Sequence, residues 1–313
     1  MKAFEVLHPG IHTAVQDLGR PGFMKYGIPA SGFADRFSGR VANLLVGNAP
    51  GAALLEVTLF RLELLALEDL AIAVTGENFS PMMNGNPLPM WQTAFVKSGD
   101  RIAFKARKQG FRSYLAVQGG FSGLSFLGSR SVFTRGLMGS SLKAGEILEA
   151  QSTDARLAPP KFLAKDMIPP SPSDDPLRVI RGPQEDRFTR QGIGTFLSSE
   201  YRVSPQSDRM GYRLQGPPVE HVKGADIISE PIPRGAIQVP GDGLPILLLW
   251  DAQVSGGYTK IAGVISADLD RVAQIMPGDK LRFQAVALEE AHELRRKEWA
   301  NFQQVQKSIE NQG

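Results

Sequence analysis

The chain has 313 residues, of which 42% are hydrophobic and 21% charged, with 35 basic and 32 acidic residues and a formal net charge of +3. This length predicts two domains, and the absence of cysteine excludes disulfides, thiolate nucleophiles and cysteine-bound zinc. Because the charges form no blocks and no segment has the uncharged apolar length of a membrane span, we expect no nucleic-acid and no membrane partner.

The amino terminus carries Glu5 where a signal peptide would have its apolar segment, so we expect a cytoplasmic protein. Short apolar runs bounded by Gly, Pro or Asp predict a mainly β chain, in keeping with 33 glycines and 22 prolines. We expect strands over 70–75, 101–104, 114–117, 177–180, 245–249 and 280–286. We expect helices over 34–46, 186–196, 267–274 and 288–309, the last packing its apolar side on the β-structure.

A proline-rich segment divides the chain into two halves. Residues 151–176 contain six prolines, which fix the backbone and remove hydrogen-bond donors, so they predict an extended linker. We therefore expect one barrel-like domain over 1–150 and a second over 177–313, the second including the final helix.

The two halves repeat one local signal. Gly99-Asp100 precedes the strand expected over 101–104, Gly278-Asp279 precedes the one over 280–286, and Gly145-Glu146 is a weaker copy. Glycine before an acidic residue is typical of a turn that leads into a strand, since glycine tolerates positive φ. The repeat favours a duplicated barrel-like domain.

The densest polar cluster is Ser-Asp-Arg-Met-Gly-Tyr-Arg at 207–213. Gly211 opposes a helix there, whereas Ser207 and Asp208 favour a turn. The planar fork of an arginine matches the geometry of carboxylate and phosphate groups, so the cluster predicts an anion-binding loop. A purely structural Asp–Arg turn is the alternative.

Two further glycine-rich stretches carry polar side chains. Residues 15–32 form neither a Walker A motif nor a dinucleotide-binding fingerprint, because the required spacing is missing.

Two acidic residues lie in or next to apolar runs. Asp251 comes shortly after the apolar run 245–249, where it could either contact a ligand or cap a turn. Glu56, inside an apolar run, needs a cationic partner, for which Arg20 and Arg61 are candidates. With no suitable histidine cluster, we expect neither a metal site nor triad hydrolysis.

Four motifs, at 13–20, 42–48, 207–214 and 235–240, resemble the allophanate hydrolase subunit 2 family. That family includes KipA-like proteins, the C subunit of ATP-dependent 5-oxoprolinase, and part of the carboxyltransferase domain of biotin-dependent urea carboxylase. The resemblance covers about residues 4–285 and implies a mainly β fold: two tandem cyclophilin-like β-barrel domains with a few helices and a C-terminal helix. One departure is Arg61, which stands where a glycine is usual.

The resemblance implies a component of a 5-oxoprolinase complex that phosphorylates the lactam of 5-oxoproline for hydrolysis to glutamate. It also implies two partner proteins, one KipI-like and one LamB/YcsF-like, with ATP and Mg²⁺ acting in the complex. Two alternatives stay open: a carboxyltransferase for urea or a related amide with a separate biotin protein, and a non-catalytic KipA-like antagonist of a KipI-type kinase inhibitor. We expect no biotin on this chain, because its two Met-Lys pairs lack the biotinylation context.

The candidate site residues fall into two groups. Those expected to act in catalysis are Asp17, Arg20, Asp208, Arg209 and Arg213. Those expected to bind substrate or phosphate are Gln16, Ser31, Ser207, Gln238, Asp242, Asp251 and Lys260. Arginine and lysine can neutralise phosphoryl oxygens, and aspartate can act together with Mg²⁺, so these residue types suit the implied reaction.

Overall fold

The computed structural model describes residues 1–105, 110–151, 159–170 and 175–312. The chain forms two compact units: unit 1 comprises residues 1–20, 31–171 and 300–313, and unit 2 comprises residues 21–30 and 172–299. The domain limits at 150 and 177 stay a prediction. Parts of the expected linker, 152–158 and 171–174, lie outside the described residues, whereas Leu163 is buried in the core of unit 1.

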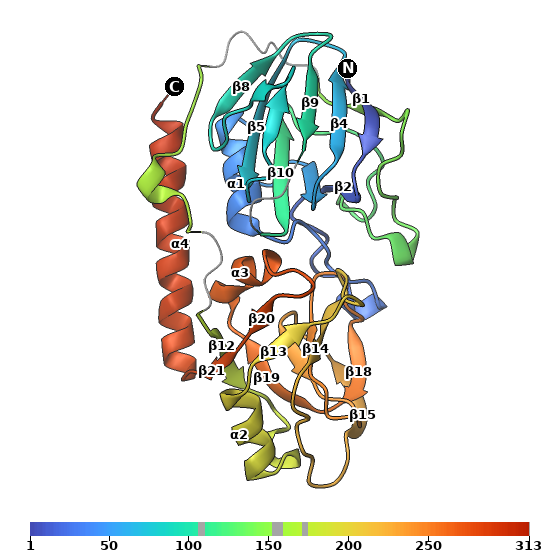
Figure 1. Ribbon diagram of the computed structural model, residues 1–313, viewed down its shortest axis with the longest axis vertical. Helices are drawn as coiled ribbons and strands as arrows, with labels where there is room; N and C mark the ends of the chain where they lie inside the picture. The colour runs from blue at the N-terminus through green and yellow to red at the C-terminus, as the bar shows by residue number, and fades with distance from the viewer. Residues whose placement is uncertain (106–109, 152–158, 171–174, 313) are drawn as a thin grey trace. The chain divides into compact units, whose positions relative to one another are not determined.

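Unit 1 contains two antiparallel sheets (Figure 1). The six-stranded sheet has the order β11-β1-β4-β9-β6-β7, and the five-stranded sheet has the order β2-β3-β10-β5-β8. The strands are β1 (Lys2–Pro9), β2 (His12–Gln16), β3 (Leu54–Thr58), β4 (Leu62–Ala66), β5 (Leu70–Gly76), β6 (Pro81–Met83), β7 (Asn86–Pro87), β8 (Thr93–Val96), β9 (Arg101–Phe104), β10 (Arg112–Val117) and β11 (Ile147–Glu149). Buried aliphatic side chains of both sheets, such as Leu64, Ile102, Ile72 and Leu115, form one core.

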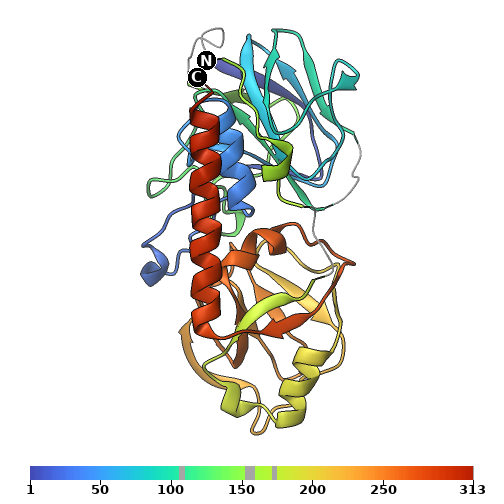
Figure 2. The same cartoon turned by 90° about the vertical axis from the view of Figure 1, so that its left-hand side faces the viewer.

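Two helices complete a second core in unit 1. Helix α1 (Arg36–Leu45) begins after Asp35, whose Oδ1 accepts a hydrogen bond from Ser38 N at 2.9 Å and caps the helix. Its apolar side packs on β5 and β10 together with the end of helix α4 (Leu288–Glu310), which contributes Phe302 and Val305. Figure 2 shows α4 as one continuous helix. The final helix thus packs its apolar side in this core, in part on α1, where the Phe37 and Phe302 ring centroids lie 6.4 Å apart.

Unit 2 is built on a nearly closed eight-stranded sheet of the order β20-β13-β14-β17-β16-β19-β12-β21, with β15 and β18 as a separate pair. Its strands are β12 (Leu177–Arg181), β13 (Tyr201–Val203), β14 (Gly211–Gln215), β15 (Asp226–Pro231), β16 (Ala236–Gln238), β17 (Ile246–Leu248), β18 (Ser255–Tyr258), β19 (Lys260–Val264), β20 (Lys280–Leu281) and β21 (Phe283–Ala285). Its helices are α2 (Arg190–Ser198) and α3 (Leu269–Ala273). The 3₁₀ helices are shared between the two units. Unit 1 has η2 (Thr134–Gly136) and η4 (Lys165–Met167), and unit 2 has η1 (Met24–Tyr26), η5 (Glu185–Arg187) and η6 (Ser266–Asp268).

The prediction of a mainly β chain with few helices is confirmed. Two expected elements differ in detail. The strand expected over 280–286 is divided, since β20 pairs with β13 whereas β21 pairs in parallel with β12. The helix expected from residue 186 begins only at Arg190, because the Thr189 side chain caps it by accepting a hydrogen bond from Gly192 N at 2.9 Å.

The predicted repeat is a turn with the same hydrogen bonds at all three places. An acidic side chain accepts from the backbone N–H three residues earlier: Asp100 from Lys97 at 2.8 Å, Glu146 from Lys143 at 2.9 Å and Asp279 from Met276 at 3.0 Å. The glycines before them, Gly99, Gly145 and Gly278, have φ of 91°, 79° and 96°. The turn precedes β9 and β11 in unit 1 and β20 in unit 2, so the local repeat is confirmed.

The carboxylate of Glu56 is buried in unit 1, where it pairs with Arg112 at 3.4 Å. Its Oε2 also accepts hydrogen bonds from Ala34 N at 2.7 Å and from the Tyr114 hydroxyl at 3.2 Å. Burial, followed by the charges of Glu56 and Asp35, raises the pKa of Tyr114 well above its ordinary range. Arg112 was not among the partners expected for Glu56, because it lies on a strand far along the chain.

Candidate functional site

The predicted loop of unit 1 is organised around Asp17, which follows β2 and is 9% exposed. Its Oδ1 accepts hydrogen bonds from Gly19 N at 2.7 Å and from the hydroxyls of Ser129 and Ser131 at 2.6 Å each. Its Oδ2 accepts from Arg130 N at 2.6 Å. Donors of the protein itself therefore engage both oxygens, and Asp17 holds the segment 129–131 against the end of β2.

The other predicted residues of this loop are also buried. Arg20 is 1% exposed, and its guanidinium donates to the carbonyl oxygens of Ser131 and, at 3.4 Å, Phe126. Gln16 donates from Nε2 to Val132 O at 3.1 Å, and its buried Oε1 has no hydrogen-bond partner among the described residues. Ser31 is buried with φ of 54°. Oε1 of Gln16 is thus one buried acceptor of this group that no described residue satisfies.

In unit 2, the loop 207–213 forms a turn through its own side chains. Oδ1 of Asp208 accepts from Met210 N at 2.7 Å, and the Ser207 hydroxyl accepts from Arg213 N at 3.1 Å. The side chain of Arg213 is exposed on β14. Ser207 and Asp208 therefore shape the loop, as their preference for turns leads one to expect.

The central arginine of that loop reaches a second predicted residue. Nε of Arg209 donates to Oδ2 of Asp251 at 2.8 Å, and Asp251 N donates to Arg209 O at 3.0 Å. Both side chains are nearly buried, at 11% and 10% exposure. Oδ1 of Asp251 is buried without a hydrogen-bond partner among the described residues. A buried carboxylate oxygen without a donor is costly, so this atom is the strongest candidate of unit 2 for contact with a ligand.

Lys260 and Gln238 belong to a separate polar cluster beside the β15–β18 pair. They are register partners on β16 and β19, and the buried ammonium of Lys260 forms an ion pair with Glu230. Glu230 also accepts from Gln184 Nε2 at 2.7 Å. The hydrogen bond from Lys260, followed by that from Gln184, lowers the pKa of Glu230 below its ordinary value. The cation of Lys260 is therefore already paired within unit 2.

Asp242 lies apart from these groups in an exposed turn, where its Oδ1 accepts from Leu244 N at 3.0 Å. The structure thus brings together Arg209 with Asp251, Gln238 with Lys260, and Gln16, Asp17 and Arg20 with the segment 129–132. Asp242 and the Arg213 side chain join none of these pairs.

Sequence reasoning missed the partners that complete each group. Ser129 and Ser131 lie more than a hundred residues from Asp17, and Gln184 lies 46 residues from Glu230. The Ser-Arg-Ser triplet after Gly128 was the only local signal for the first set. A histidine contact was also missed: the Ser141 hydroxyl lies 2.9 Å from Nδ1 of His12.

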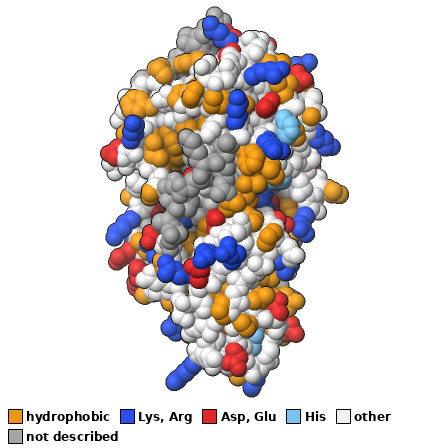
Figure 3. Space-filling view, viewed as in Figure 1, with side chains coloured by type: hydrophobic (Ala, Val, Ile, Leu, Met, Phe, Trp, Pro, Cys, Tyr) orange, Lys and Arg blue, Asp and Glu red, His pale blue; other side chains and the backbone are white. Residues whose placement is uncertain are grey.

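The kinds of side chain in the described ranges, and the distribution of their charges, indicate which ligands the chain can bind. In the described ranges, no group of three or more His, Asp or Glu side chains could hold a metal ion, and no helix is long and apolar enough to cross a membrane. On the face shown in Figure 3, basic and acidic side chains are interspersed. The arrangement suits a small polar ligand held by hydrogen bonds and by single charged groups.

Comparison with known proteins supplies the context for these groups. A family model described as the carboxyltransferase domain, subdomain A and B, matches residues 26–285. The 5-oxoprolinase C subunit of Haemophilus influenzae is 34% identical over 311 residues, 98% of each chain, and that of Escherichia coli is 34% identical over 312 residues, 98% of this chain and 99% of its own. The crystal structure of the Kluyveromyces lactis urea carboxylase superposes with a TM-score of 0.89 at 32% identity, covering 100% of this chain and 29% of its own.

Proposed function

This chain belongs to the carboxyltransferase family of subdomains A and B, and on that basis we propose that it is one component of an ATP-dependent 5-oxoprolinase. The observation that carries the proposal is the similarity to the C subunits of two 5-oxoprolinases over 98% of this chain. Relatives that are named as one of several subunits imply further subunits. We propose a KipI-like protein and a LamB/YcsF-like protein as the partners with which the chain is active.

Among the candidate residues, we propose that Oδ1 of Asp251 in unit 2 and Oε1 of Gln16 in unit 1, both buried without a hydrogen-bond partner in the described part of the chain, each face a ligand in their own unit. Both are acceptors, and a lactam offers an N–H donor. A carboxylate that accepts this N–H shifts electron density toward the lactam oxygen, because hydrogen bonds in series polarise one another. That oxygen then attacks the terminal phosphorus of ATP more readily, and ADP leaves as the bond from this phosphorus to its bridging oxygen breaks.

In this proposal, Arg209 acts through Asp251. Its Nε fixes Oδ2 of the carboxylate at 2.8 Å, which leaves Oδ1 as the acceptor with a defined direction. Arg213, exposed on β14, is the cation of the loop that we propose to meet phosphoryl oxygens.

ATP and Mg²⁺ are proposed at the level of the complex. The described residues of this chain form no cluster of three metal ligands, so they do not make a magnesium site from protein side chains alone. Magnesium commonly binds through nucleotide phosphates and one or two carboxylates, so we place no step through the ion on this chain. We propose no covalently bound biotin here.

Reconstitution tests this function. The chain is co-expressed with the KipI-like protein, the LamB/YcsF-like protein is added, and ATP hydrolysis is measured with 5-oxoproline, with proline, and with neither. Proline keeps the ring and the carboxylate but lacks the lactam carbonyl, so only 5-oxoproline should stimulate ATP turnover and yield glutamate. A complex of all three proteins whose ATP turnover ignores 5-oxoproline contradicts the proposal.

The similarity to urea carboxylase favours one second candidate function. Carboxyl transfer to urea or a related amide, with a separate biotin protein, uses the same kind of amide ligand. It predicts transfer of labelled carboxyl from a carboxylated biotin protein to urea without 5-oxoproline-dependent ATP turnover by this chain's complex.

A further inference from the structure

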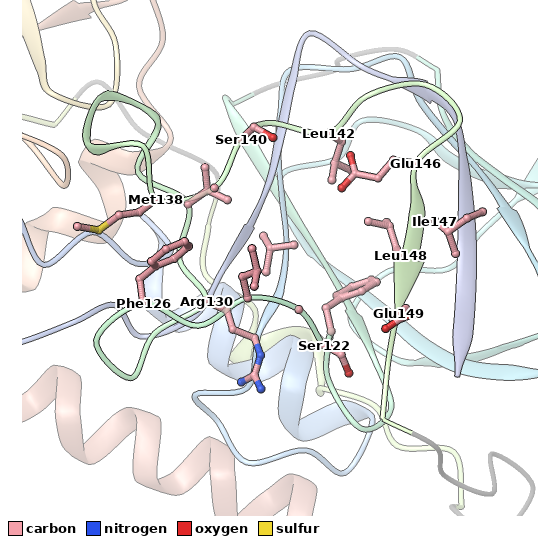
Figure 4. Close-up of a pocket in the computed structure, with 16 residues that line it drawn as sticks. Ser122, Phe126, Arg130, Met138, Ser140, Leu142, Glu146, Ile147, Leu148 and Glu149 are labelled. Atoms are coloured by element: carbon pink, nitrogen blue, oxygen red, sulfur yellow. The ribbon is translucent and has the colours of Figure 1, made fainter.

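Unit 1 contains a hollow that none of the candidate site residues lines. Its volume is about 310 Å³, near the lower end of the range for small-molecule sites. Its wall is mainly apolar, with Val15, Phe121, Val132 and Leu148 among the lining residues. Phe126, Arg130 and Met138 lie on one side of the hollow, and Glu146 and Leu148 lie on the other (Figure 4).

Arg130 is the one cationic side chain among the lining residues. It is half-buried, and its Nε is buried without a hydrogen-bond partner. No carboxylate in the described part of the chain forms an ion pair with it; its one hydrogen bond is made by the backbone N–H. A buried N–H without an acceptor is costly, so the Nε of this cation in the hollow favours a ligand that supplies an acceptor, and an anion best of all.

The backbone of Arg130 is held in position independently of its side chain. Asp17 accepts the Arg130 N–H at 2.6 Å and the hydroxyls of the flanking Ser129 and Ser131. Val132 N, two residues on, donates to Val15 O at 3.0 Å. The guanidinium is therefore carried by a fixed segment, which reduces the entropy lost when it binds a ligand.

The two acidic residues of the lining each have a neighbour within the fold. Glu146 belongs to the repeated turn, where its Oε2 accepts from Lys143 N at 2.9 Å. Glu149 on β11 lies directly opposite Lys2 on β1, which places a cation beside it. Among the lining side chains, Arg130 is thus the one with a buried polar atom that no described residue satisfies.

We propose that this hollow binds a small monocarboxylate with a compact apolar body, whose carboxylate pairs with the Arg130 guanidinium. The apolar wall takes the carbon skeleton, and the planar fork takes both carboxylate oxygens. The site is distinct from the Asp251 and Gln16 oxygens, and its ligand class includes 5-oxoproline as well as simple cyclic carboxylates.

Calorimetric binding to the full chain alone tests this site. The probes are cyclopentanecarboxylate, 5-oxoproline, and the uncharged cyclopentanecarboxamide, which keeps the shape without the charge. The carboxylate should bind at least about ten-fold more tightly than the amide, and more weakly as salt is raised. A preference for 5-oxoproline assigns the hollow to the substrate, whereas equal binding of both acids assigns it to carboxylates in general.

Matched variants locate the binding. Arg130→Gln should weaken carboxylate binding at least about ten-fold with an unchanged melting temperature, because Asp17 holds the backbone and not the side chain. Lys143→Gln removes an exposed cation of unit 1 that lies outside the lining and should change little. Ser140→Phe adds a ring at the lining and should block binding.

Binding that survives Arg130→Gln, or an amide that binds as tightly as the acid, overturns the proposal. If Arg130→Gln does not fold, Ser140→Phe still decides, since retained binding there also overturns it. These measurements need neither ATP nor partner proteins. Their failure is therefore distinct from failure of the proposed 5-oxoprolinase function.

Discussion

Two aspartates of almost equal burial differ in how their oxygens are used. Asp17 in unit 1 is 9% exposed and accepts four hydrogen bonds from the protein, whereas Asp251 in unit 2 is 8% exposed and has one oxygen bound by Arg209 and one without a donor. Burial alone does not separate them. The number of donors to a carboxylate, and not its depth, therefore distinguishes a residue that stabilises the fold from one that can bind a ligand.

The largest expected effect is on activity at Asp251. Asp251→Asn keeps the shape and can still accept from Arg209, but it removes the charge that polarises the lactam. We expect 5-oxoproline-dependent ATP turnover of the complex to fall at least about 100-fold. The free energy of unfolding should fall by about 1 kcal/mol or less. Full turnover in this variant would place Asp251 with Asp17 among structural residues.

The matched change at Asp17 should act on stability. In Asp17→Asn, the amide N–H₂ replaces one carboxylate oxygen and so faces at least one N–H or O–H group that donated to that oxygen. The buried donors on that side are left without an acceptor. We expect the free energy of unfolding to fall by about 2–3 kcal/mol, measured by urea denaturation. An unchanged midpoint would remove the distinction between the two aspartates.

Glu230 offers an intermediate case, a carboxylate whose partner is the buried cation of Lys260. Because its folded pKa lies below its ordinary value of 4.5, its stabilising contribution is present above that value and is lost as the pH falls through the folded pKa. Unfolding of the wild type and of Glu230→Gln should therefore differ at neutral pH and converge in acid. A difference that stays constant down to the lowest pH contradicts the ion pair.

The smallest expected effect is on stability at Arg61, a change that leaves the carboxylates of Asp251, Asp17 and Glu230 in place. Arg61 has φ of 72°, in the left-handed region that favours glycine, and its side chain is exposed. Arg61→Gly should therefore raise the free energy of unfolding by about 1 kcal/mol. Thermal unfolding measures this gain, and a loss of stability would show that the contact of Arg61 with the Phe60 ring matters more than its backbone strain.

Local features of the fold could be predicted from the sequence, because they depend on neighbouring residues. The strand at Arg101–Phe104 matches its expected bounds, and the Gly-Asp turns recur as expected. The site was harder, because its contacts join distant residues: Arg209 and Asp251 are 42 positions apart, and Asp17 and Arg130 are 113 apart. Polar motifs identified the loops, but only the fold shows which oxygens of each loop are already bound.

The most direct test of the central claim, that Arg209 and Asp251 act as one unit on the ligand, is a double-mutant cycle. ATP turnover of the complex in response to 5-oxoproline is measured for the wild type, Arg209→Ala, Asp251→Asn and the double variant, with exposed Arg190→Ala as a control for loss of positive charge. If Arg209 acts through Asp251, the double variant is about as slow as either single variant, and the complex still assembles throughout. Additive losses, or full turnover in Arg209→Ala, would contradict the claim.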